Sequence, residues 1–306
     1  MNSTRSITFR QYTSEDYRRI DDFLIRHYRP DNQDGNWVEP AWEYMHGHPF
    51  LDSASLGKIG IWEEAGEIVA ITHYESRLGE AFFQCHPDYR YLRQKMLAYA
   101  EENLWGRRKE DGSKYLLAFV NDQDNDFLAL VKSLGYVRKP EWNRPFSKFS
   151  IPEPFPEIEL PPGFRLTSLA EECDWEKVHR ALWRGFNHEG EPPSGEDELE
   201  SRRQMFDTPK ARRDLKIAVA APDGSFVSFC GMFYQSVNRF AYVEPVATDP
   251  DYRRLGLGRA AVLEGIRRCS DLGATVAYVG SDQAFYLSFG FEVINASECW
   301  VKTFEE

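Results

Sequence analysis

One stretch in the second half of the chain constrains its local fold more than any other. An apolar, strand-like run at 243–248 is followed by a loop with the pattern Arg253-x-x-Gly256-x-Gly258, and an amphipathic helix pattern begins at Ala260. A loop of this kind points successive backbone N–H groups at one place, and the helix N-terminus behind it adds partial positive charge. We therefore expect an anion site that suits a pyrophosphate; the alternative is an ordinary turn between a strand and a helix.

The two glycines support the first interpretation. A side chain at Gly256 or Gly258 would block close approach of an anion or disfavour the backbone angles that the loop needs. Further along the chain, the run 284–291 places Tyr286 on a short helix that ends in Gly290-Phe291. The loop and the tyrosine helix, in this order, resemble the GCN5-related N-acetyltransferase (GNAT) family.

The resemblance implies that acetyl-CoA is the cosubstrate of this half. The family's strand bulge, here at Val246 and Ala247, would expose backbone groups to the pantetheine arm. The loop residues expected to hold the pyrophosphate are Arg253, Arg254, Leu255, Gly256, Leu257, Gly258 and Arg259.

Two residues are expected to carry the proton transfers of direct acyl transfer to an amine. The position of Tyr286 matches the family's tyrosine, whose phenol protonates the departing thiolate; the alternative is a core aromatic residue. Glu244 is the base expected to accept the amine proton, directly or through water. A carboxylate inside an otherwise apolar strand is costly without a partner or a wet cleft, although a solvated side chain at a strand edge is the alternative.

The acceptor site is expected where the resemblance places the first helices of the second half. Aromatic and acidic side chains gather there and would suit a cationic amine, although they could equally cap the core. The residues expected to bind the substrate are Trp183, Phe186, His188 and Glu189.

A proline-rich segment divides the chain. Residues 151–163 contain five prolines and cannot form a long helix or a central strand. The flanking halves repeat each other weakly, since His86-Pro87-Asp88-Tyr89-Arg90 echoes Asp249-Pro250-Asp251-Tyr252-Arg253, and Leu134-Gly135-Tyr136 echoes Phe289-Gly290-Phe291. We therefore predict an α/β protein of two tandem GNAT-like domains, 1–150 and 164–306, each with a twisted mixed β-sheet flanked by helices.

The first copy departs from the pattern where chemistry would occur. After Arg90 it reads Tyr91-Leu92-Arg93-Gln94-Lys95, with no glycine at the positions of Gly256 and Gly258. Side chains there would crowd a pyrophosphate. The first domain is therefore expected to be degenerate, packing against the second and shaping its substrate site.

Composition limits the class of protein. The chain of 306 residues has a formal net charge of -12, which argues against a nucleic-acid partner. No apolar run reaches membrane-spanning length and the N-terminus lacks a signal core, so we expect no membrane association and a cytoplasmic location. The five cysteines form no CxxC pair, and no cluster around His46 and His48 completes a metal site.

The sequence therefore predicts an acyltransferase that moves an acetyl group from acetyl-CoA to a primary amine of a small molecule. Longer acyl donors stay open, as does the identity of the amine. The alternative is a non-catalytic module that binds CoA or acyl-CoA as a sensor or scaffold.

Overall fold

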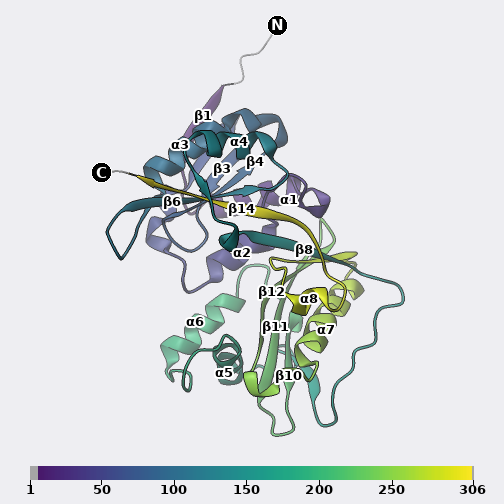
Figure 1. Ribbon diagram of the computed structural model, residues 1–306. Coiled ribbons are helices and arrows are strands. Elements are labelled where there is room, and N and C mark those ends of the chain that lie inside the picture. Colours follow the sequence, from purple (N-terminus) through teal and green to yellow (C-terminus); the bar gives the residue numbers. More distant parts are fainter. Residues whose placement is uncertain (1–5, 305–306) are drawn as a thin grey trace. The chain divides into compact units, whose positions relative to one another are not determined.

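The computed structural model describes residues 6–304 and forms two compact units (Figure 1). The N-terminal unit comprises Met1–Met45, Phe50–Pro145 and Ile294–Glu306, and the C-terminal unit comprises His46–Pro49 and Phe146–Val293. These bounds differ from the sequence-based domains of 1–150 and 164–306. The bounds differ because two strands pair across the expected boundary. The last strand, 292–304, pairs with 114–121 of the N-terminal unit, and the strand before the proline-rich segment, 144–150, pairs with 276–279 of the C-terminal unit.

The N-terminal unit is built on a mixed sheet in the order β1-β2-β3-β4-β6-β14. Its strands are β1 (Ile7–Gln11), β2 (Gly60–Glu64), β3 (Glu67–His73), β4 (Glu80–Cys85), β5 (Gly106–Arg107), β6 (Lys114–Asn121), β7 (Val137–Arg138) and, from Ile294 on, β14 (Glu292–Phe304). Its helices are α1 (Asp16–Arg26), α2 (Glu39–Gly47, which ends inside the C-terminal unit), α3 (Arg93–Asn103) and α4 (Asn125–Ser133).

The C-terminal unit has a sheet in the order β8-β13-β12-β11-β10-β9. Its strands are β8 (Arg144–Ser150), β9 (Arg165–Ser168), β10 (Lys216–Ala220), β11 (Phe226–Gln235), β12 (Phe240–Thr248) and β13 (Val276–Val279). Its helices are α5 (Trp175–Gly185), α6 (Glu196–Phe206), α7 (Leu257–Asp271) and α8 (Ala284–Leu287). Helices α7 and α8 lie on one side of β10–β12, and α5 and α6 lie on the other (Figure 1).

Each sheet contains one parallel strand pair that separates before its strands end. In the C-terminal unit β12 pairs with β13 only from Phe240 to Tyr242. In the N-terminal unit β4 pairs with β6 only at Glu80 and Ala81. Beyond these points the strands diverge, so both units contain a wedge whose strand edges are not paired with each other.

A bulge accompanies this divergence in the C-terminal unit. Cys230 of β11 lies opposite Val246 and Met232 lies opposite Val243, so Gly231 faces two residues of β12, Glu244 and Pro245. A Cβ atom at position 231 would collide with the backbone carbonyl of Glu244, which explains the glycine. A bulge bends its strand and increases the local twist. The sequence-based prediction put the bulge at Val246 and Ala247, two residues too late.

The apolar residues of each helix face its sheet as their spacing predicts. In α1 the buried residues Ile20, Phe23 and Leu24 recur at helical spacing. In α7 the buried Ala261, Val262 and Ile266 pack on the inner face of β10–β12. These cores confirm the α/β fold class with two mixed sheets.

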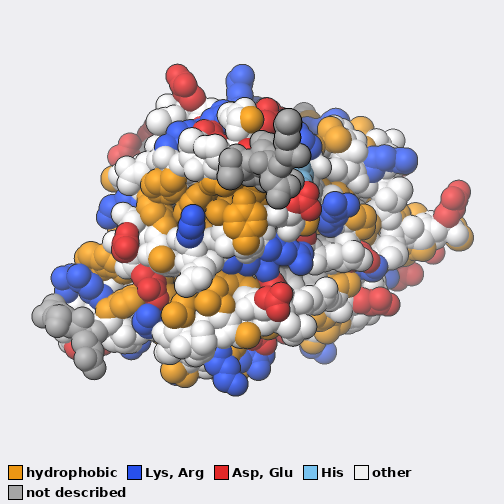
Figure 2. Space-filling model, turned by 90° about the horizontal axis from the view of Figure 1, so that it is seen from above, with side chains coloured by type: hydrophobic (Ala, Val, Ile, Leu, Met, Phe, Trp, Pro, Cys, Tyr) orange, Lys and Arg blue, Asp and Glu red, His pale blue; other side chains and the backbone are white. Residues whose placement is uncertain are grey.

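The surface carries charges of both signs. On the face seen in Figure 2, Lys and Arg side chains are interspersed with Asp and Glu, and apolar side chains lie between them. Within residues 6–304 no helix combines the length and the apolar character needed to cross a bilayer.

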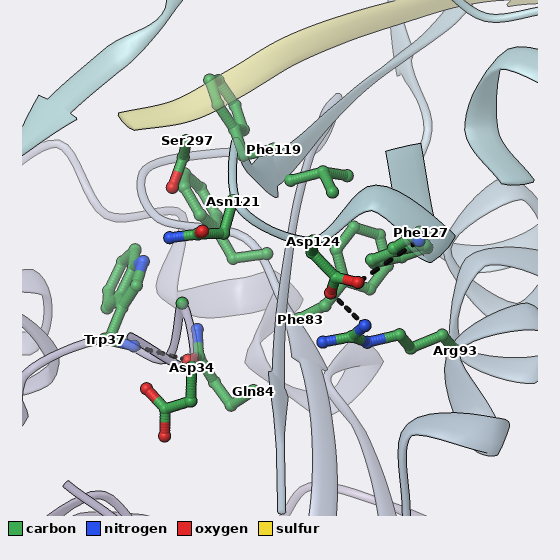
Figure 3. A pocket seen from close by; sticks show the side chains of 13 residues that line it. Asp34, Trp37, Phe83, Gln84, Arg93, Phe119, Asn121, Asp124, Phe127 and Ser297 are labelled. Atoms are coloured by element: carbon green, nitrogen blue, oxygen red, sulfur yellow. Dashed lines mark hydrogen bonds and ion pairs between the residues drawn. The ribbon is translucent and has the colours of Figure 1, made fainter. Parts of the chain in front are cut away.

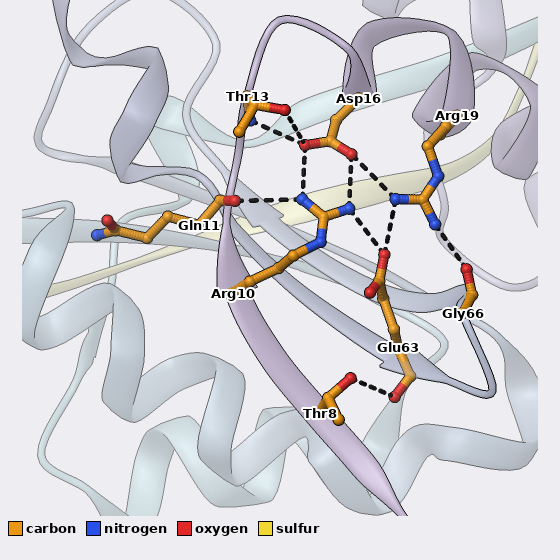
Figure 4. A network of polar contacts seen from close by, with 8 residues as sticks. All are labelled: Thr8, Arg10, Gln11, Thr13, Asp16, Arg19, Glu63 and Gly66. Atoms are coloured by element: carbon orange, nitrogen blue, oxygen red, sulfur yellow. Dashed lines mark hydrogen bonds and ion pairs between the residues drawn. The ribbon is translucent and has the colours of Figure 1, made fainter.

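A network of ion pairs joins the first strand and first helix of the N-terminal unit (Figure 4). Arg10 of β1 donates to both carboxylate oxygens of the buried Asp16 at 2.6 Å and to Glu63 of β2 at 2.7 Å. Arg19 lies 2.8 Å from Glu63 and 3.2 Å from Asp16. The N–H and hydroxyl of Thr13 also donate to Asp16. Burial alone would raise the pKa of Asp16, but the hydrogen bonds from Arg10 and Thr13 outweigh it and lower the pKa from 3.8 to about 2.

We predict that this network makes the stability of the N-terminal unit depend on pH. Because the pKa of Asp16 is lower in the folded than in the unfolded chain, its contribution is complete above about pH 4 and is lost as the pH falls through 2. The size of the contribution is roughly 2 kcal/mol. Urea unfolding of Asp16→Asn between pH 2 and 7 tests this. The variant should lose stability at pH 7 and converge on the wild type near pH 2; an equal difference at both ends of the range would contradict the assignment.

Candidate active site

A large cleft in the C-terminal unit brings together the two sequence features singled out above. Its volume is about 920 Å³, and its walls come from the end of α5, the end of β12, the glycine loop with the start of α7, and the region of α8. The lining residues are Gly185, Phe186, Asn187, Val246, Ala247, Thr248, Tyr252, Arg253, Arg254, Gly256, Leu257, Gly258, Arg259, Gln283, Ala284, Phe285, Tyr286, Ser288 and Phe289. The cleft opens on the side where β12 has separated from β13.

The two glycines of the loop have different physical roles. Gly256 is the N-cap residue of α7 and has a φ of 81°, in the left-handed region, while nothing lies within 4 Å of the place its Cβ would take. Gly258 has no such conformational need, but a Cβ there would lie 2.9 Å from Thr248 Oγ1 and 3.2 Å from the Phe285 ring. The first glycine permits the turn and the second permits close packing.

The start of α7 leaves backbone donors facing the cleft. Within residues 6–304 the first hydrogen bond donated by this turn is that of Ala260 N–H to Gly256 C=O. The N–H groups of Leu257, Gly258 and Arg259 therefore lack intrahelical acceptors, as expected of a first helical turn. Together with the positive end of α7, they form an electropositive cradle suited to an anion.

The arginines of the loop lie in different surroundings. The Arg253 guanidinium donates to Thr248 C=O at 3.1 Å, to Gly185 C=O at 2.9 Å and to Asn187 Oδ1 at 2.8 Å. Arg254, with a φ of 67°, and Arg259 are exposed at the cleft. Arg253 thus ties the end of α5 to the end of β12, whereas the other two are available to an anion. Leu255 is 45% exposed and, among the described residues, does not line the cleft.

A second clamp holds α5 in the same place. Arg184 donates to the buried Asp249 from Nε at 2.5 Å and from Nη2 at 3.1 Å, and also to Asp251 at 2.6 Å. Burial alone would raise the pKa of Asp249, but the bonds from Arg184 and from Asp251 N–H outweigh it and lower that pKa. A Cβ at Gly185 would lie 2.6 Å from Ala247 Cβ, so α5 approaches β12 as closely as a glycine allows.

Tyr286 lies against the cleft with little exposure. It is 7% exposed and its ring packs on Phe285 and Phe291 at centroid distances of 4.8 and 5.5 Å. Within residues 6–304 no hydrogen bond of its hydroxyl is recorded. Burial, followed by the nearby Cys230 and Glu244, raises the pKa of Tyr286 above its usual range. The phenol therefore keeps its proton across ordinary pH and can donate it.

Glu244 is half-buried in the bulge of β12. It does not line the cleft, but its negative charge is near enough to raise the pKa of both Tyr286 and Cys230. Glu244 therefore acts on the phenol electrostatically, from outside the lining of the cleft.

Of the four residues expected to bind the acceptor, only Phe186 lines the cleft, where it is 48% exposed. Trp183 stacks on His188 at 4.4 Å and donates through Nε1 to Gly190 C=O. Glu189 is exposed. Trp183, in the last turn of α5, and His188 and Glu189, in the turn that follows, thus lie outside the lining of the cleft.

Several lining residues carried no sequence signal. Gly185, Asn187 and Thr248 reach the cleft only because α5 crosses the end of β12. Phe285 and Phe289 flank Tyr286 and form part of the cleft wall. The proximity of α5 to β12 is a tertiary feature that a strand-loop-helix pattern does not encode.

The comparisons with known proteins agree with this geometry. Residues 175–291 match the model of the acetyltransferase (GNAT) family, a range that spans α5 to α8. No curated protein matches the sequence. The C-terminal unit therefore contains a domain of the GNAT family, which is a class of acyltransferase.

Solved structures extend the likeness to the whole fold. A GCN5-related N-acetyltransferase from Sphaerobacter thermophilus is 16% identical with a TM-score of 0.64, covering 97% of this chain and 95% of that one. A tandem GNAT protein from the clavulanic acid biosynthesis pathway, described without AcCoA, is 14% identical with a TM-score of 0.63, covering 97% and 98%. Saccharomyces cerevisiae N-myristoyltransferase with bound myristoyl-CoA is 11% identical with a TM-score of 0.56, covering 98% and 79%. The chain has the tandem GNAT fold.

We predict that Arg253 positions α5 chiefly through its forked donors. Arg253→Lys keeps the positive charge, but a single ammonium group lacks the planar fork that donates to Thr248, Gly185 and Asn187 at the same time. Backbone amide hydrogen exchange at Phe186, Asn187 and His188 should then become about tenfold faster. Arg254→Lys is the matched control and should leave exchange at these amides unchanged. Equal exchange in the wild type and Arg253→Lys would show that the clamp does not hold this turn.

Proposed function

We propose that the C-terminal unit transfers an acetyl group from acetyl-CoA to a primary amine of a small molecule. The observation that carries the proposal is the shared cleft: the glycine loop at the start of α7 and the Tyr286 side chain line the same cavity. Binding groups for an anion and a proton donor are thus held on one surface by rigid elements.

The cleft fits the parts of CoA that carry recognisable chemistry. Its free N–H groups and the exposed Arg254 and Arg259 suit a pyrophosphate. The end of β12, at Val246 and Thr248, offers a strand edge where pairing with β13 has already ended, which suits an amide-bearing arm. When bound, acetyl-CoA supplies an activated thioester whose acetyl carbon bonds to the amine nitrogen as the C–S bond breaks.

The chain's own contribution is to bind, orient and move protons. Tyr286 stays protonated at ordinary pH because burial, followed by nearby charge, raises its pKa. Its neutral hydroxyl is the proposed donor to the sulfur as the C–S bond breaks. Glu244 is the proposed base for the proton that the amine nitrogen loses, and because it lies outside the cleft lining it would act through water. Positioning of the two reactants supplies the remaining rate enhancement.

The acceptor is proposed to be an amine for reasons of charge and surface. The chain has a net charge of -12, and Phe186 offers an exposed aromatic ring at the cleft. An aromatic face in an acidic protein favours a cationic small molecule over an anionic one. The fold does not fix which amine is used.

We predict that Tyr286→Phe separates binding from chemistry. The substitution removes only the hydroxyl, so the Kd for acetyl-CoA should stay within about twofold while kcat falls about 100-fold. Thiol release over a panel of small amines measures turnover, and calorimetry measures binding. Phe289→Tyr, which adds a hydroxyl elsewhere on the same wall, is the control and should not restore activity in the double variant.

The outcomes separate the proposal from a CoA sensor. Binding of acetyl-CoA with thiol release for a class of amines supports the enzyme. Binding without turnover on any amine would favour the sensor. Unchanged kcat in Tyr286→Phe would remove the phenol from the mechanism, and absence of binding would overturn the proposal.

A further inference from the structure

The N-terminal unit has a wedge at the position that corresponds to the cleft of the C-terminal unit. It lies where β4 and β6 separate, between the starts of α3 and α4 (Figure 3). The space left in it is about 20 Å³, against about 920 Å³ in the C-terminal unit. That is room for about one water molecule. Side chains of the N-terminal unit therefore fill most of this wedge.

The internal repeat identifies the corresponding positions. We align the repeat on its two matching runs, 86–90 and 249–253. In this alignment Cys85 corresponds to Thr248, and Arg93 corresponds to Gly256. The backbone supports this match, because His86 N–H donates to Val69 C=O as Asp249 N–H donates to Val227 C=O.

The strand edge of β4 is paired with the side chain of Asn36. Since His86 N–H points to β3, the backbone groups of Cys85 point the other way, into the wedge. The Oδ1 atom of Asn36 accepts from Cys85 N–H at 2.7 Å, and its Nδ2 donates to Cys85 C=O at 3.1 Å. Asn36 is 6% exposed. The side-chain amide of Asn36 thus forms the two hydrogen bonds with Cys85 that the amide group of a bound ligand would form.

The neighbours of Asn36 seal the same space. Trp37 N–H donates to Gln84 Oε1 at 2.6 Å, as Figure 3 shows, and Gln84 is itself buried. Gly35 approaches so closely that a Cβ there would lie 2.6 Å from Asn121 Cβ. Among the described residues, the C-terminal unit has no such plug from the segment before α6. There Pro193 C=O is hydrogen-bonded to His179, and Pro193 does not line the cleft.

The anion end of the wedge is filled by an ion pair. Arg93, at the position of Gly256, pairs with Asp124, and both side chains are 11% exposed (Figure 3). The guanidinium also lies 5.3 Å from the Phe127 ring. A pyrophosphate entering here would meet a carboxylate and an arginine that is already neutralised. Tyr286 lies four residues before Gly290, and the residue four before Gly135 in the N-terminal unit is Val131. The N-terminal unit therefore has no tyrosine at the position of the proposed proton donor.

From these contacts we infer that the segment Asp34–Trp37 is a built-in ligand of the N-terminal unit, which closes its wedge to acyl-CoA. Each chain therefore has one acyl-CoA site, in the C-terminal unit. The number of acyl-CoA sites, one per chain, rests on the proposed function. The hydrogen bonds by which Asn36 occupies the N-terminal wedge do not depend on it.

Two measurements on the full chain test the two parts separately. In calorimetry with acetyl-CoA, the wild type should bind one equivalent and Gly256→Trp none. In hydrogen exchange, the Cys85 amide should be protected in the wild type and should exchange about tenfold faster in Asn36→Leu, with a fall in melting temperature on the order of 5 °C. Gln33→Leu, at the exposed position just before this segment, is the control and should change neither the exchange rate nor the melting temperature.

The outcomes distinguish failure of this inference from failure of the proposed function. Two equivalents in the wild type, or one retained in Gly256→Trp, would place a site in the N-terminal unit and overturn the inference. A Cys85 amide that exchanges freely in the wild type would also overturn it, whatever the binding. Absence of acetyl-CoA binding together with a protected Cys85 amide would overturn the proposed function and leave the built-in ligand supported.

Discussion

The separation of β12 from β13 after Tyr242 is the constraint on which the functional half depends. The bulge at Glu244 and Pro245, opposite Gly231, bends β12 where this separation begins. The cleft is lined by the residues of β12 that follow the bulge, Val246 to Thr248. The same bulge carries Glu244, whose charge contributes to the raised pKa of Tyr286.

The two units differ in what occupies the space where their parallel strands separate. Both sheets diverge at the corresponding parallel pair. In one unit, glycines at the start of the helix leave an open cradle. In the other, Arg93 fills the cradle and Asn36 pairs with the strand edge that the divergence exposes. Buried backbone groups need partners, so a wedge without a ligand must supply its own.

Local features were predictable from the sequence and tertiary ones were not. Gly256 and Gly258 lie in the cleft with Tyr286, where a strand-loop-helix pattern placed them, because that pattern is a property of neighbouring residues. The bulge was placed two residues too late, because strand register depends on the partner strand. Trp183 and His188 stack on each other outside the cleft lining, a contact that follows from how the chain turns after α5. The pairing of the last strand with β6 joins residues far apart in the sequence, which moved the unit boundaries.

In the proposed function, the start of α7 binds the diphosphate of acyl-CoA through its backbone N–H groups. Hydrogen exchange of the amides of Leu257, Gly258 and Arg259, with and without saturating CoA, tests this most directly. We expect CoA to slow exchange at these three amides by about tenfold or more, because each gains an acceptor. Tight binding of CoA with unchanged exchange at all three would contradict it, since the anion would then lie elsewhere.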